Sequence, residues 1–256
     1  MEQRVVIDKE KCIGCGLCKS DCVAFAIDVK DGKAVHREKG CIMCGHCEAI
    51  CPVGAVKLTG YDDEVIEIDE PVRLNPEELM MAIKTRRSIR KFKQDPIDEK
   101  ILDMILEAGR LTPTGSNKEG VSYVLLRDRL SECEEVAVSM FRGVSGFGKA
   151  FVSMLKEMDI DDHFFFKNAP AAIVILGDDK VSASLAAENM ALMAEANGLG
   201  VLYSGFFTAC YNMSGKIRTI IGSDKNPKAV TTIVLGYPDV KYRRTVHRKP
   251  LNVIKA

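Results

Sequence analysis

The strongest constraint on this chain is a cysteine spacing that occurs twice near its N-terminus. The spacing is Cys-x2-Cys-x2-Cys-x3-Cys, occupied first by Cys12, Cys15, Cys18 and Cys22 and then by Cys41, Cys44, Cys47 and Cys51. The repeat indicates an internal duplication, and eight of the ten cysteines belong to it. Clustered thiols in a chain without a secretory signal are more typical of metal ligands than of a disulfide framework. This segment is therefore expected to fold around metal.

Three thiolates separated by two residues each can converge on one cubane iron–sulfur cluster, whereas the fourth lies too far along the chain to close the same cluster comfortably. Four-thiolate zinc is the alternative, but each run has a third regularly spaced cysteine that a pair of Cys-x2-Cys units does not need. The pattern resembles the bacterial two-cluster ferredoxins, in which the fourth cysteine ligates the other cluster. The resemblance implies two [4Fe–4S] clusters, one held by Cys12, Cys15, Cys18 and Cys51 and the other by Cys22, Cys41, Cys44 and Cys47.

Small residues inside the two runs fit this interpretation. Gly14, Gly16 and Gly45 let backbone N–H groups turn toward an anionic cluster without an intervening side chain. Pro52 matches the Cys-Pro ending of the ferredoxin family, and Val23 departs from it after the first run. The departure leaves the ligand set intact. A histidine inside the second run is expected to face solvent rather than to bind metal.

Charge and hydropathy narrow the possible partners. The chain has 256 residues, and its 36 basic side chains balance 36 acidic ones, which gives no support for a nucleic-acid or membrane-surface partner. No apolar run approaches the roughly 18 residues of a membrane span. The charged N-terminus lacks an apolar signal region, so the expected location is the cytoplasm. At about 100–200 residues per domain, the length allows one large domain or two smaller ones.

The change in composition near residue 60 predicts three parts. They are a ferredoxin domain at residues 1–60, a linker at 61–76 and a second domain at 77–256. Tyr61–Glu70 alternates acidic with apolar residues, as either a short strand or an extended linker would. Asn75 then has the features of a helix N-cap, because Pro76 takes the first helical position and two glutamates follow.

Periodicity gives the coarse elements of the second domain. It predicts helices at residues 77–85, 97–110 and 182–197, the last capped by Gly198, and strands at 121–127, 171–176 and 230–235. The strand at 171–176 is apolar throughout, as expected for a strand buried on both faces. The alternation of helices and strands is irregular, so the pattern does not give the strand order.

Polar clusters indicate where the chemistry of the second domain lies. Lys84–Lys91 places several cations and Ser88 directly after a helix, where arginine can bind a phosphate with bidentate geometry. Taken alone, this run is better explained as a solvated basic face or a nucleic-acid patch. Two further clusters favour a ligand-binding role for this run: the polar loop Thr112–Asn117 and the basic segment Arg243–Leu251.

Residues 77–256 resemble the nitroreductase-like flavoproteins in the order of five motifs: Arg-Arg-Ser-x-Arg, Pro-Thr-Gly-Ser-Asn, a helix ending Gly-Leu-Gly, Gly-Tyr-Pro and Arg-Lys-Pro-Leu. The resemblance implies an α+β sandwich with a central, mainly antiparallel sheet, in a homodimer that binds FMN between subunits. It implies that flavin N5 does the chemistry, and no side chain is assigned as catalytic. The implied FMN contacts are Arg86, Arg87, Ser88, Arg90 and Arg248 at the phosphate, ribityl and carbonyl groups, Pro113, Thr114, Gly115, Ser116 and Asn117 at the ring edge, and Ser204, Gly205 and Phe206 on the N5 side.

The sequence also departs from that family. Many members have Asn-Gln-Pro-Trp after the proline loop, whereas this chain has Asn117–Gly120 there and no tryptophan. The resemblance therefore does not indicate which residues form the floor of the substrate pocket. The Gly- and Phe-rich segment Phe141–Phe166 could be a lid over the flavin ring or an apolar helix pair at the dimer seam. Cys133 and Cys210 are expected to be buried apolar residues rather than a redox pair.

No Gly-x-Gly-x-x-Gly follows a predicted strand, so a separate nucleotide-binding domain for NAD(P)H is not expected. No histidine sits in a recognisable acid–base pattern; those considered are His36, His163 and His247.

The fusion of two such domains predicts an oxidoreductase. Iron–sulfur clusters carry one electron at a time, whereas FMN can exchange one electron or two, so the clusters can load the flavin from a one-electron donor. The expected external donor is a one-electron carrier or NAD(P)H, whose nicotinamide, by the family resemblance, can stack directly on the flavin. The expected acceptor is a small electrophile such as a nitroaromatic or quinone, with Arg90 and Lys118 as positive groups that stabilise reduced flavin. Two alternatives remain open: a reductive dehalogenase or enone reductase using the same pocket, and an electron-transfer adaptor to a protein partner.

Overall fold

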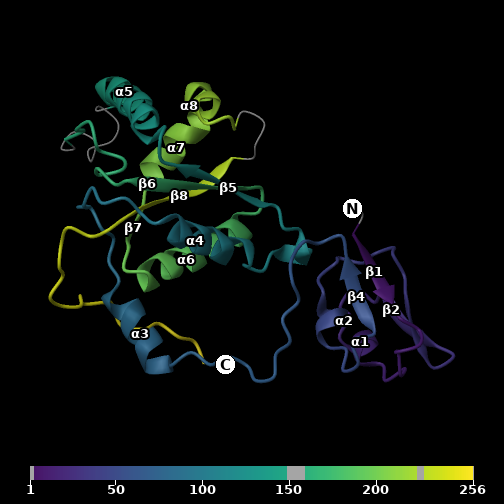
Figure 1. The fold of residues 1–256 in the computed structure, drawn as a ribbon. Helices are drawn as coiled ribbons and strands as arrows, with labels where there is room; N and C mark the ends of the chain where they lie inside the picture. The colour runs from purple at the N-terminus through teal and green to yellow at the C-terminus, as the bar shows by residue number, and fades with distance from the viewer. Residues whose placement is uncertain (1–2, 149–158, 224–227, 256) are drawn as a thin grey trace. The chain divides into compact units, whose positions relative to one another are not determined.

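The computed structural model describes residues 3–148, 159–223 and 228–255 (Figure 1). By its internal contacts the chain forms two compact units. Unit 1 comprises Met1–Val72 together with Thr114–Lys118, and unit 2 comprises Arg73–Pro113 and Glu119–Ala256.

Unit 1 is built from two small antiparallel sheets. Strand β1 (Arg4–Ile7) pairs with β4 (Val56–Thr59) and so brings the two ends of the ferredoxin-like segment together. Strands β2 (Ile27–Lys30) and β3 (Lys33–His36) form a hairpin. Its two-residue turn is Asp-Gly with both residues in the left-handed region (φ 50° and 71°), which matches the twist of the flanking strands.

The duplication in the sequence is repeated in the backbone. Helix α1 (Leu17–Ser20) begins after Gly16, and α2 (His46–Ala49) begins after Gly45. These glycines have φ values of 80° and 76°, a left-handed conformation that a side chain disfavours. Each short helix carries the third cysteine of its run, so both runs turn through the same local structure.

The core of unit 1 is small and includes cysteine sulfur. Its fully buried members are Cys12, Cys18, Ile27, Ala34 and Ala55. So little apolar surface gives a weak hydrophobic driving force for a unit of this size, and domains of this kind need a metal group or a similar cross-link to be stable. The segment that follows, residues 60–75, has no helix or strand, and the expected alternative of a short strand at Tyr61–Glu70 is not formed.

Unit 2 has one four-stranded antiparallel sheet with the order β5-β6-β8-β7. The strands are β5 (Val121–Leu126), β6 (Ala171–Gly177), β8 (Ala229–Gly236) and β7 (Gly200–Tyr203). The three strands predicted from the sequence are confirmed, as is the mainly antiparallel α+β architecture. The strand β7 was not predicted, because it has only four residues and directly follows a helix.

Strand β6 lies between the two apolar layers of unit 2. All seven of its residues are buried. Since successive side chains point to opposite faces, Val174 packs in one cluster with Phe207 and Tyr211, while Ile173 packs in the other with Met190. The sheet therefore separates two apolar layers, as the continuous apolar run predicted.

Helices cover both faces of this sheet (Figure 1). Helices α4 (Glu99–Arg110) and α6 (Lys180–Ala196) pack on one face. Helices α5 (Leu130–Gly148), α7 (Gly205–Met213) and α8 (Gly215–Ile220) pack on the other. The predicted helices correspond to α4 and α6, with Gly198 in the left-handed conformation (φ 75°) just beyond the C-terminus of α6.

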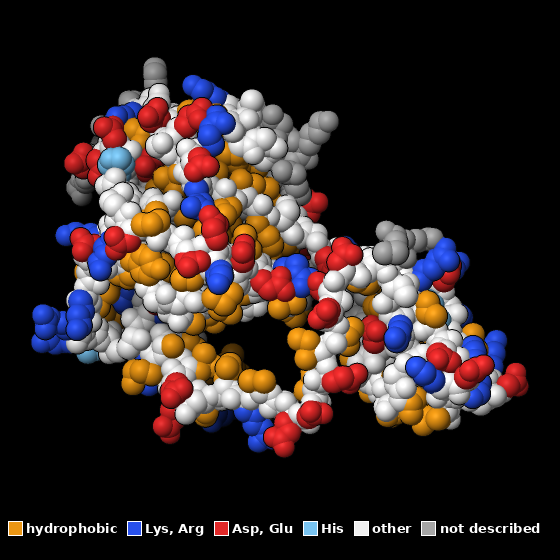
Figure 2. All heavy atoms as spheres, viewed as in Figure 1, with side chains coloured by type: hydrophobic (Ala, Val, Ile, Leu, Met, Phe, Trp, Pro, Cys, Tyr) orange, Lys and Arg blue, Asp and Glu red, His pale blue; other side chains and the backbone are white. Residues whose placement is uncertain are grey.

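Two parts of unit 2 are exposed. Helix α3 (Pro76–Thr85) begins where predicted, with Asn75 Oδ1 accepting hydrogen bonds from Glu77 and Glu78, but it buries none of its residues. Its apolar side chains therefore stay at the surface, and Met80 and Met81 are 51% and 56% exposed. Figure 2 shows hydrophobic side chains at the surface in the part of the view where Figure 1 places α3. Residues 241–255 have no helix or strand and are likewise exposed. Within the described ranges, the helices are too short or too polar to cross a bilayer.

Candidate functional site

The eight clustered cysteines line two separate hollows in unit 1. The first hollow is lined by Cys12, Cys15, Cys18 and Cys51, and the second by Cys22, Cys41, Cys44 and Cys47. Each hollow thus takes three cysteines from one run and the fourth from the other. Each run contributes its fourth cysteine to the other hollow because the β1–β4 pairing and the β2–β3 hairpin bring the two cysteine runs together.

Backbone N–H groups point at the sulfurs of these hollows. Ala34 N donates to Cys12 Sγ at 3.3 Å, and Ala26 N donates to Cys22 Sγ at 3.2 Å. Ala55 N donates to Cys51 Sγ at 3.2 Å. Such donors favour the thiolate form, and the N–H groups of Ala34 and Gly14 lower the pKa of the Cys12 thiol. The donor set therefore suits an anionic cluster.

The spacing of the side chains argues against a single ion. Among the described residues, no three His, Cys, Asp or Glu side chains are placed to share one metal ion. In a cubane each thiolate binds a different iron, so its four ligands surround a cluster rather than meet at a point. The second hollow also holds an orphaned polar atom: His36 lines it, and His36 Nε2 is buried without a hydrogen-bond partner in the described structure. The residues present fit an iron–sulfur cluster in each hollow.

Gly14 fixes the loop of the first hollow against the hairpin turn. A Cβ at this position would lie 2.1 Å from the carbonyl oxygen of Gly32, and the backbone has φ 68°. Both facts exclude a larger side chain. The close approach of Gly14 to the hairpin turn is a second reason for glycine here, and the sequence did not reveal it.

In unit 2, the basic segment after α3 is anchored to the edge of the sheet. Ser88 forms a parallel bridge with Val201 of β7, and Ile89 N donates to Val201 O at 3.0 Å. Ile89 is buried, whereas Ser88 and Arg90 are exposed. The anchor explains how a polar segment without regular structure can present its cations in a fixed place.

Arg86 has a partner that the sequence did not reveal. Its guanidinium group donates to both carboxylate oxygens of Glu188 in α6, at 2.9 and 3.2 Å. Tyr203 Oη donates to the same carboxylate at 2.9 Å, and burial together with this carboxylate raises the pKa of Tyr203. Glu188 stands out in the sequence only as an acidic residue in a mostly apolar helix, which is a weak signal.

The polar loop between α4 and β5 belongs to unit 1 by its contacts. Residues Gly115–Asn117 form one turn of 3-10 helix, in which Ser116 and Asn117 have positive φ values of 54° and 52°. Asn117 Nδ2 donates to Met43 O at 3.2 Å. Met43 lies between Cys41 and Cys44, so this loop contacts the rim of the second hollow.

The stretch Ser204–Phe206 follows β7, and hydrogen bonds from Ser204 fix its position. Ser204 N donates to Thr232 O at 2.8 Å, and Ser204 Oγ donates to Phe165 O at 3.0 Å. The Ser204 side chain therefore faces the interior, while Gly205 and Phe206 are exposed. Within the predicted stretch, Phe206 therefore exposes a side chain and Gly205 exposes its backbone, whereas the side chain of Ser204 is buried.

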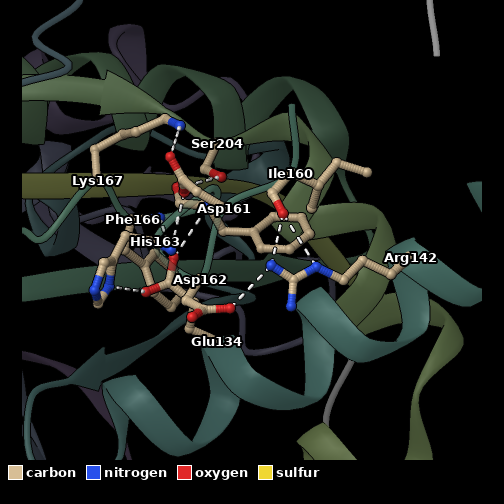
Figure 3. Close-up of polar contacts among 10 residues, drawn as sticks. Glu134, Arg142, Ile160, Asp161, Asp162, His163, Phe166, Lys167 and Ser204 are labelled. Carbon is tan, nitrogen blue, oxygen red and sulfur yellow. Dashed lines mark hydrogen bonds and ion pairs between the residues drawn. The ribbon is translucent and has the colours of Figure 1, made fainter. Parts of the chain in front are cut away.

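A buried carboxylate, that of Glu134, binds the backbone of the neighbouring segment, and Figure 3 shows it beside Phe166 and His163. Glu134 Oε1 accepts hydrogen bonds from Phe165 N at 3.0 Å and Phe166 N at 2.7 Å. Glu134 Oε2 lies 3.5 Å from His163 Nδ1, and burial raises the pKa of the carboxyl group. The same side chains border a cavity of about 510 Å³ beside α5. Sequence reasoning missed Glu134, because its acidic neighbours on α5 are exposed and nothing distinguishes it from them.

The remaining predicted residues are less constrained. Arg248 lies in the exposed C-terminal segment. Pro113 is exposed at the end of α4, in unit 2. The two ends of the segment Phe141–Phe166 pack together, with ring centroids of Phe141 and Phe164 5.7 Å apart, and its middle lies outside the described residues.

Cys133 and Cys210 are buried as predicted. They are 0% and 1% exposed, and burial raises the pKa of each thiol to about 11. A thiol with so high a pKa is a poor nucleophile at neutral pH. Both residues belong to the apolar layer under α5 and α7.

Comparison with known proteins agrees with both units. The model of the nitroreductase family matches residues 83–237, and that of a 4Fe-4S dicluster domain matches residues 4–52. A protein of Archaeoglobus fulgidus, whose name refers to NADH dehydrogenase and NAD(P)H nitroreductase, is 29% identical over 63% of this chain and 86% of its own. Iodotyrosine deiodinase of Hydra vulgaris is 22% identical over 72% of this chain and 76% of its own. A nitroreductase with bound FMN from Bacteroides fragilis superposes with a TM-score of 0.53, 21% identity and coverage of 70% of this chain and 99% of that one.

Fold, cysteine hollows and family models together define an oxidoreductase that joins a ferredoxin-type 4Fe-4S domain to a flavoprotein domain. The chain belongs to the nitroreductase family. As a member of that family it is an FMN-dependent oxidoreductase.

Proposed function

We propose that the protein takes up electrons one at a time at two [4Fe–4S] clusters and passes them to FMN, where a small electrophilic acceptor is reduced. The observation that carries this proposal is the contact between Asn117 and the cysteine loop. Four of the five residues that the family resemblance assigns to the flavin ring edge, residues 114–117, lie in unit 1 with the eight clustered cysteines. Asn117 Nδ2 donates to Met43 O at 3.2 Å, between two cysteines of the second hollow. This hydrogen bond supports the proposed transfer, because a residue expected at the flavin ring edge contacts the loop between two cysteines.

The ligand sets proposed for the two clusters are those of the two hollows, three cysteines from one run and one from the other. For FMN, the anchored segment offers Arg87 and Arg90 as cations for the phosphate, whereas Arg86 is paired with Glu188. The family resemblance adds the ring-edge loop and the stretch after β7 to the proposed contacts. The chemistry that FMN supplies is the conversion between one-electron and two-electron steps, and the protein supplies position and charge.

The first test is anaerobic. The clusters of the full chain are reduced photochemically, and flavin absorbance is followed before and after addition of a nitroaromatic. We expect flavin reduction to follow cluster reduction, and the acceptor to reoxidise both. The variant Asn117→Ala is expected to slow the cluster-to-flavin phase while direct reduction of its flavin by dithionite is unchanged. Flavin that stays oxidised beside reduced clusters would contradict the electron path, and NADPH added in place of light tests the second donor.

The similarity to iodotyrosine deiodinase favours a second acceptor class, the aryl halides. In such a reaction two electrons and one proton replace the carbon–halogen bond with carbon–hydrogen and release halide. Release of iodide from an iodophenol, with no turnover of nitroaromatics, would select this reaction over nitro reduction. Turnover of neither class, with fast reduction of an added carrier protein, would favour an electron-transfer adaptor.

We further propose that the chain acts as a homodimer. Exposed apolar side chains gather on α3 and on one side of α6, including Met80, Met81, Val181 and Leu185, the last two 68% and 52% exposed. Apolar surface of this kind is costly in water unless a partner covers it, and a second copy presents the same surface. Sedimentation analysis should give a dimer, and Leu185→Glu should shift it to monomer.

A further inference from the structure

The second hollow differs from the first in one polar side chain. His36, at the end of β3, lines it together with Cys22, Cys41, Cys44 and Cys47. The residues at the first hollow include no histidine within the described structure; Ala34, Ala55 and Val56 line it instead. The two sites share their cysteine spacing but differ in what surrounds it.

The imidazole is buried on the side of Nε2 and has no internal partner there. His36 Nε2 is fully buried and makes no hydrogen bond in the described structure. A buried donor without a partner costs about 1–3 kcal/mol, so native proteins rarely leave one. The atom must therefore find its partner in something that the hollow holds.

The ring can act as a donor to an anion. An imidazole carries at least one N–H group whether it is neutral or protonated, so one of its nitrogens can donate a hydrogen bond. Four cysteines already complete the ligand set of a cubane in this hollow, which leaves no iron for the imidazole to bind.

We propose that His36 Nε2–H donates a hydrogen bond to a sulfur of the cluster held by Cys22, Cys41, Cys44 and Cys47, and so raises its reduction potential. This inference rests on the proposed function only in requiring that a cluster occupies the second hollow. Reduction adds negative charge to the cluster, and a hydrogen bond to sulfur stabilises the more negative form. The residue tunes the cluster and does not ligate it.

A matched set of variants tests the hydrogen bond. His36→Leu removes the donor, and His36→Gln keeps an N–H group at a similar reach. His46→Gln is the control, because His46 also borders the second hollow but is exposed, with its Nδ1 3.2 Å from Cys44 O. Iron and sulfide are measured first, and the two reduction steps are then titrated anaerobically by EPR.

We expect one reduction step of His36→Leu to become about tenfold less favourable, a fall of about 59 mV for a one-electron step. The other step stays in place, and His36→Gln and His46→Gln titrate as the wild type. His36→Leu with full iron content and unshifted potentials would overturn the proposal. So would an equal shift of both steps, since a local hydrogen bond cannot produce it.

A second measurement covers the case in which His36→Leu fails to load its cluster. Wild-type protein labelled with ¹⁵N-histidine should show a weak coupling between the reduced cluster and one nitrogen, lost in His36→Gln. No coupling in the wild type would refute the hydrogen bond, and a strong coupling would show direct ligation instead. Wild-type protein without iron in the second site would refute the proposed function itself, before any variant is compared.

Discussion

Single residues in this protein derive their character from burial rather than from type. Glu132, Glu134 and Glu135 lie within four positions of one another on α5, yet only Glu134 is buried, at 3% exposure. Its carboxylate binds the N–H groups of Phe165 and Phe166, and through Phe165 it supports Ser204. An acidic residue at the surface of the same helix can do none of this. Position alone separates the structural carboxylate from its neighbours.

Glu134 should give the protein a measurable pH dependence of stability. Burial raises its folded-state pKa above the ordinary 4.5, while the nearby His163 and the two N–H donors oppose the shift. Between 4.5 and the folded pKa, the folded state binds the proton more tightly than the unfolded state does. The free energy of unfolding therefore falls as pH rises through this window, by at most about 1.4 kcal/mol per pH unit.

Urea unfolding at a series of pH values, on wild type and Glu134→Gln in parallel, measures this contribution. The difference in unfolding free energy between the two should change across the window and level off above it. Arg142, Asp162 and Glu135 line the same cavity as Glu134, and Glu135→Gln controls for the general electrostatic field there. Parallel curves for wild type and Glu134→Gln would contradict the assignment.

The two isolated cysteines lead to a prediction about cofactor content. Cys133→Ala and Cys210→Ala should keep full iron and flavin, because both thiols belong to the apolar layer of unit 2. Cys133→Ser should be about 1–3 kcal/mol less stable than the wild type, since it buries a hydroxyl group without a partner. Iron analysis and urea unfolding check both statements. Loss of iron in either alanine variant would show that the thiol has a role near a cluster.

A site residue could be predicted from the sequence where its chemistry requires a fixed spacing along the chain. The cysteines were predicted, because the geometry of cluster ligation requires a fixed interval between them. The pairing of Arg86 with Glu188 could not be predicted, because the two residues are far apart in the chain and meet only through the fold. The orphaned nitrogen of His36 is invisible for the same reason. Interactions that need tertiary structure to exist leave no local signal.

At the scale of elements, prediction succeeded where an element carries its own signals. Asn75 caps α3 because its side chain can accept the free N–H groups that open a helix, and the sequence shows the cap directly. Strand β6 is recognisable because both its faces are buried and every residue is apolar. The four-residue strands of unit 1 have neither feature, and they form because pairing and the cysteine loops hold them. Short strands of this kind are determined by their partners.

The contact between β7 and the anchored basic segment gives a prediction at this scale. A Cβ on Gly200 would lie 2.3 Å from Ile89 Cγ1 and 3.0 Å from Pro238 Cγ. Gly200→Ala must therefore push the segment Arg86–Arg90 away from the sheet edge, at a cost of about 1–3 kcal/mol. We expect weaker FMN binding and a lower unfolding free energy, both measured on purified protein.

Gly143→Ala is the matched control for this substitution. A Cβ there meets no atom within 4 Å, and alanine favours the helix in which it lies. The control should bind FMN as the wild type does and be equally stable or slightly more so. Equal FMN affinity for Gly200→Ala and Gly143→Ala would show that the anchored segment takes no part in the flavin site.

At the scale of the whole chain, a one-electron unit and a two-electron unit are joined in one polypeptide. Unit 1 has too small an apolar core to fold well without a metal group, whereas unit 2 has two apolar layers around a sheet. Removal of iron should therefore unfold part of unit 1 and leave unit 2 intact. The loop that carries Asn117 belongs by its contacts to unit 1, although the chain on both sides of it belongs to unit 2.

The crossed arrangement of the cysteines gives the sharpest prediction about the whole. Cys51 lies in the second run but lines the first hollow, and Cys22 lies in the first run but lines the second. Cys51→Ala should therefore impair the cluster bound by Cys12, Cys15 and Cys18, and leave the signal shifted by His36→Leu in place. Cys22→Ala should do the reverse. EPR spectra of the two reduced variants, taken with iron content, distinguish this from ligation within each run, in which the two variants would exchange their effects.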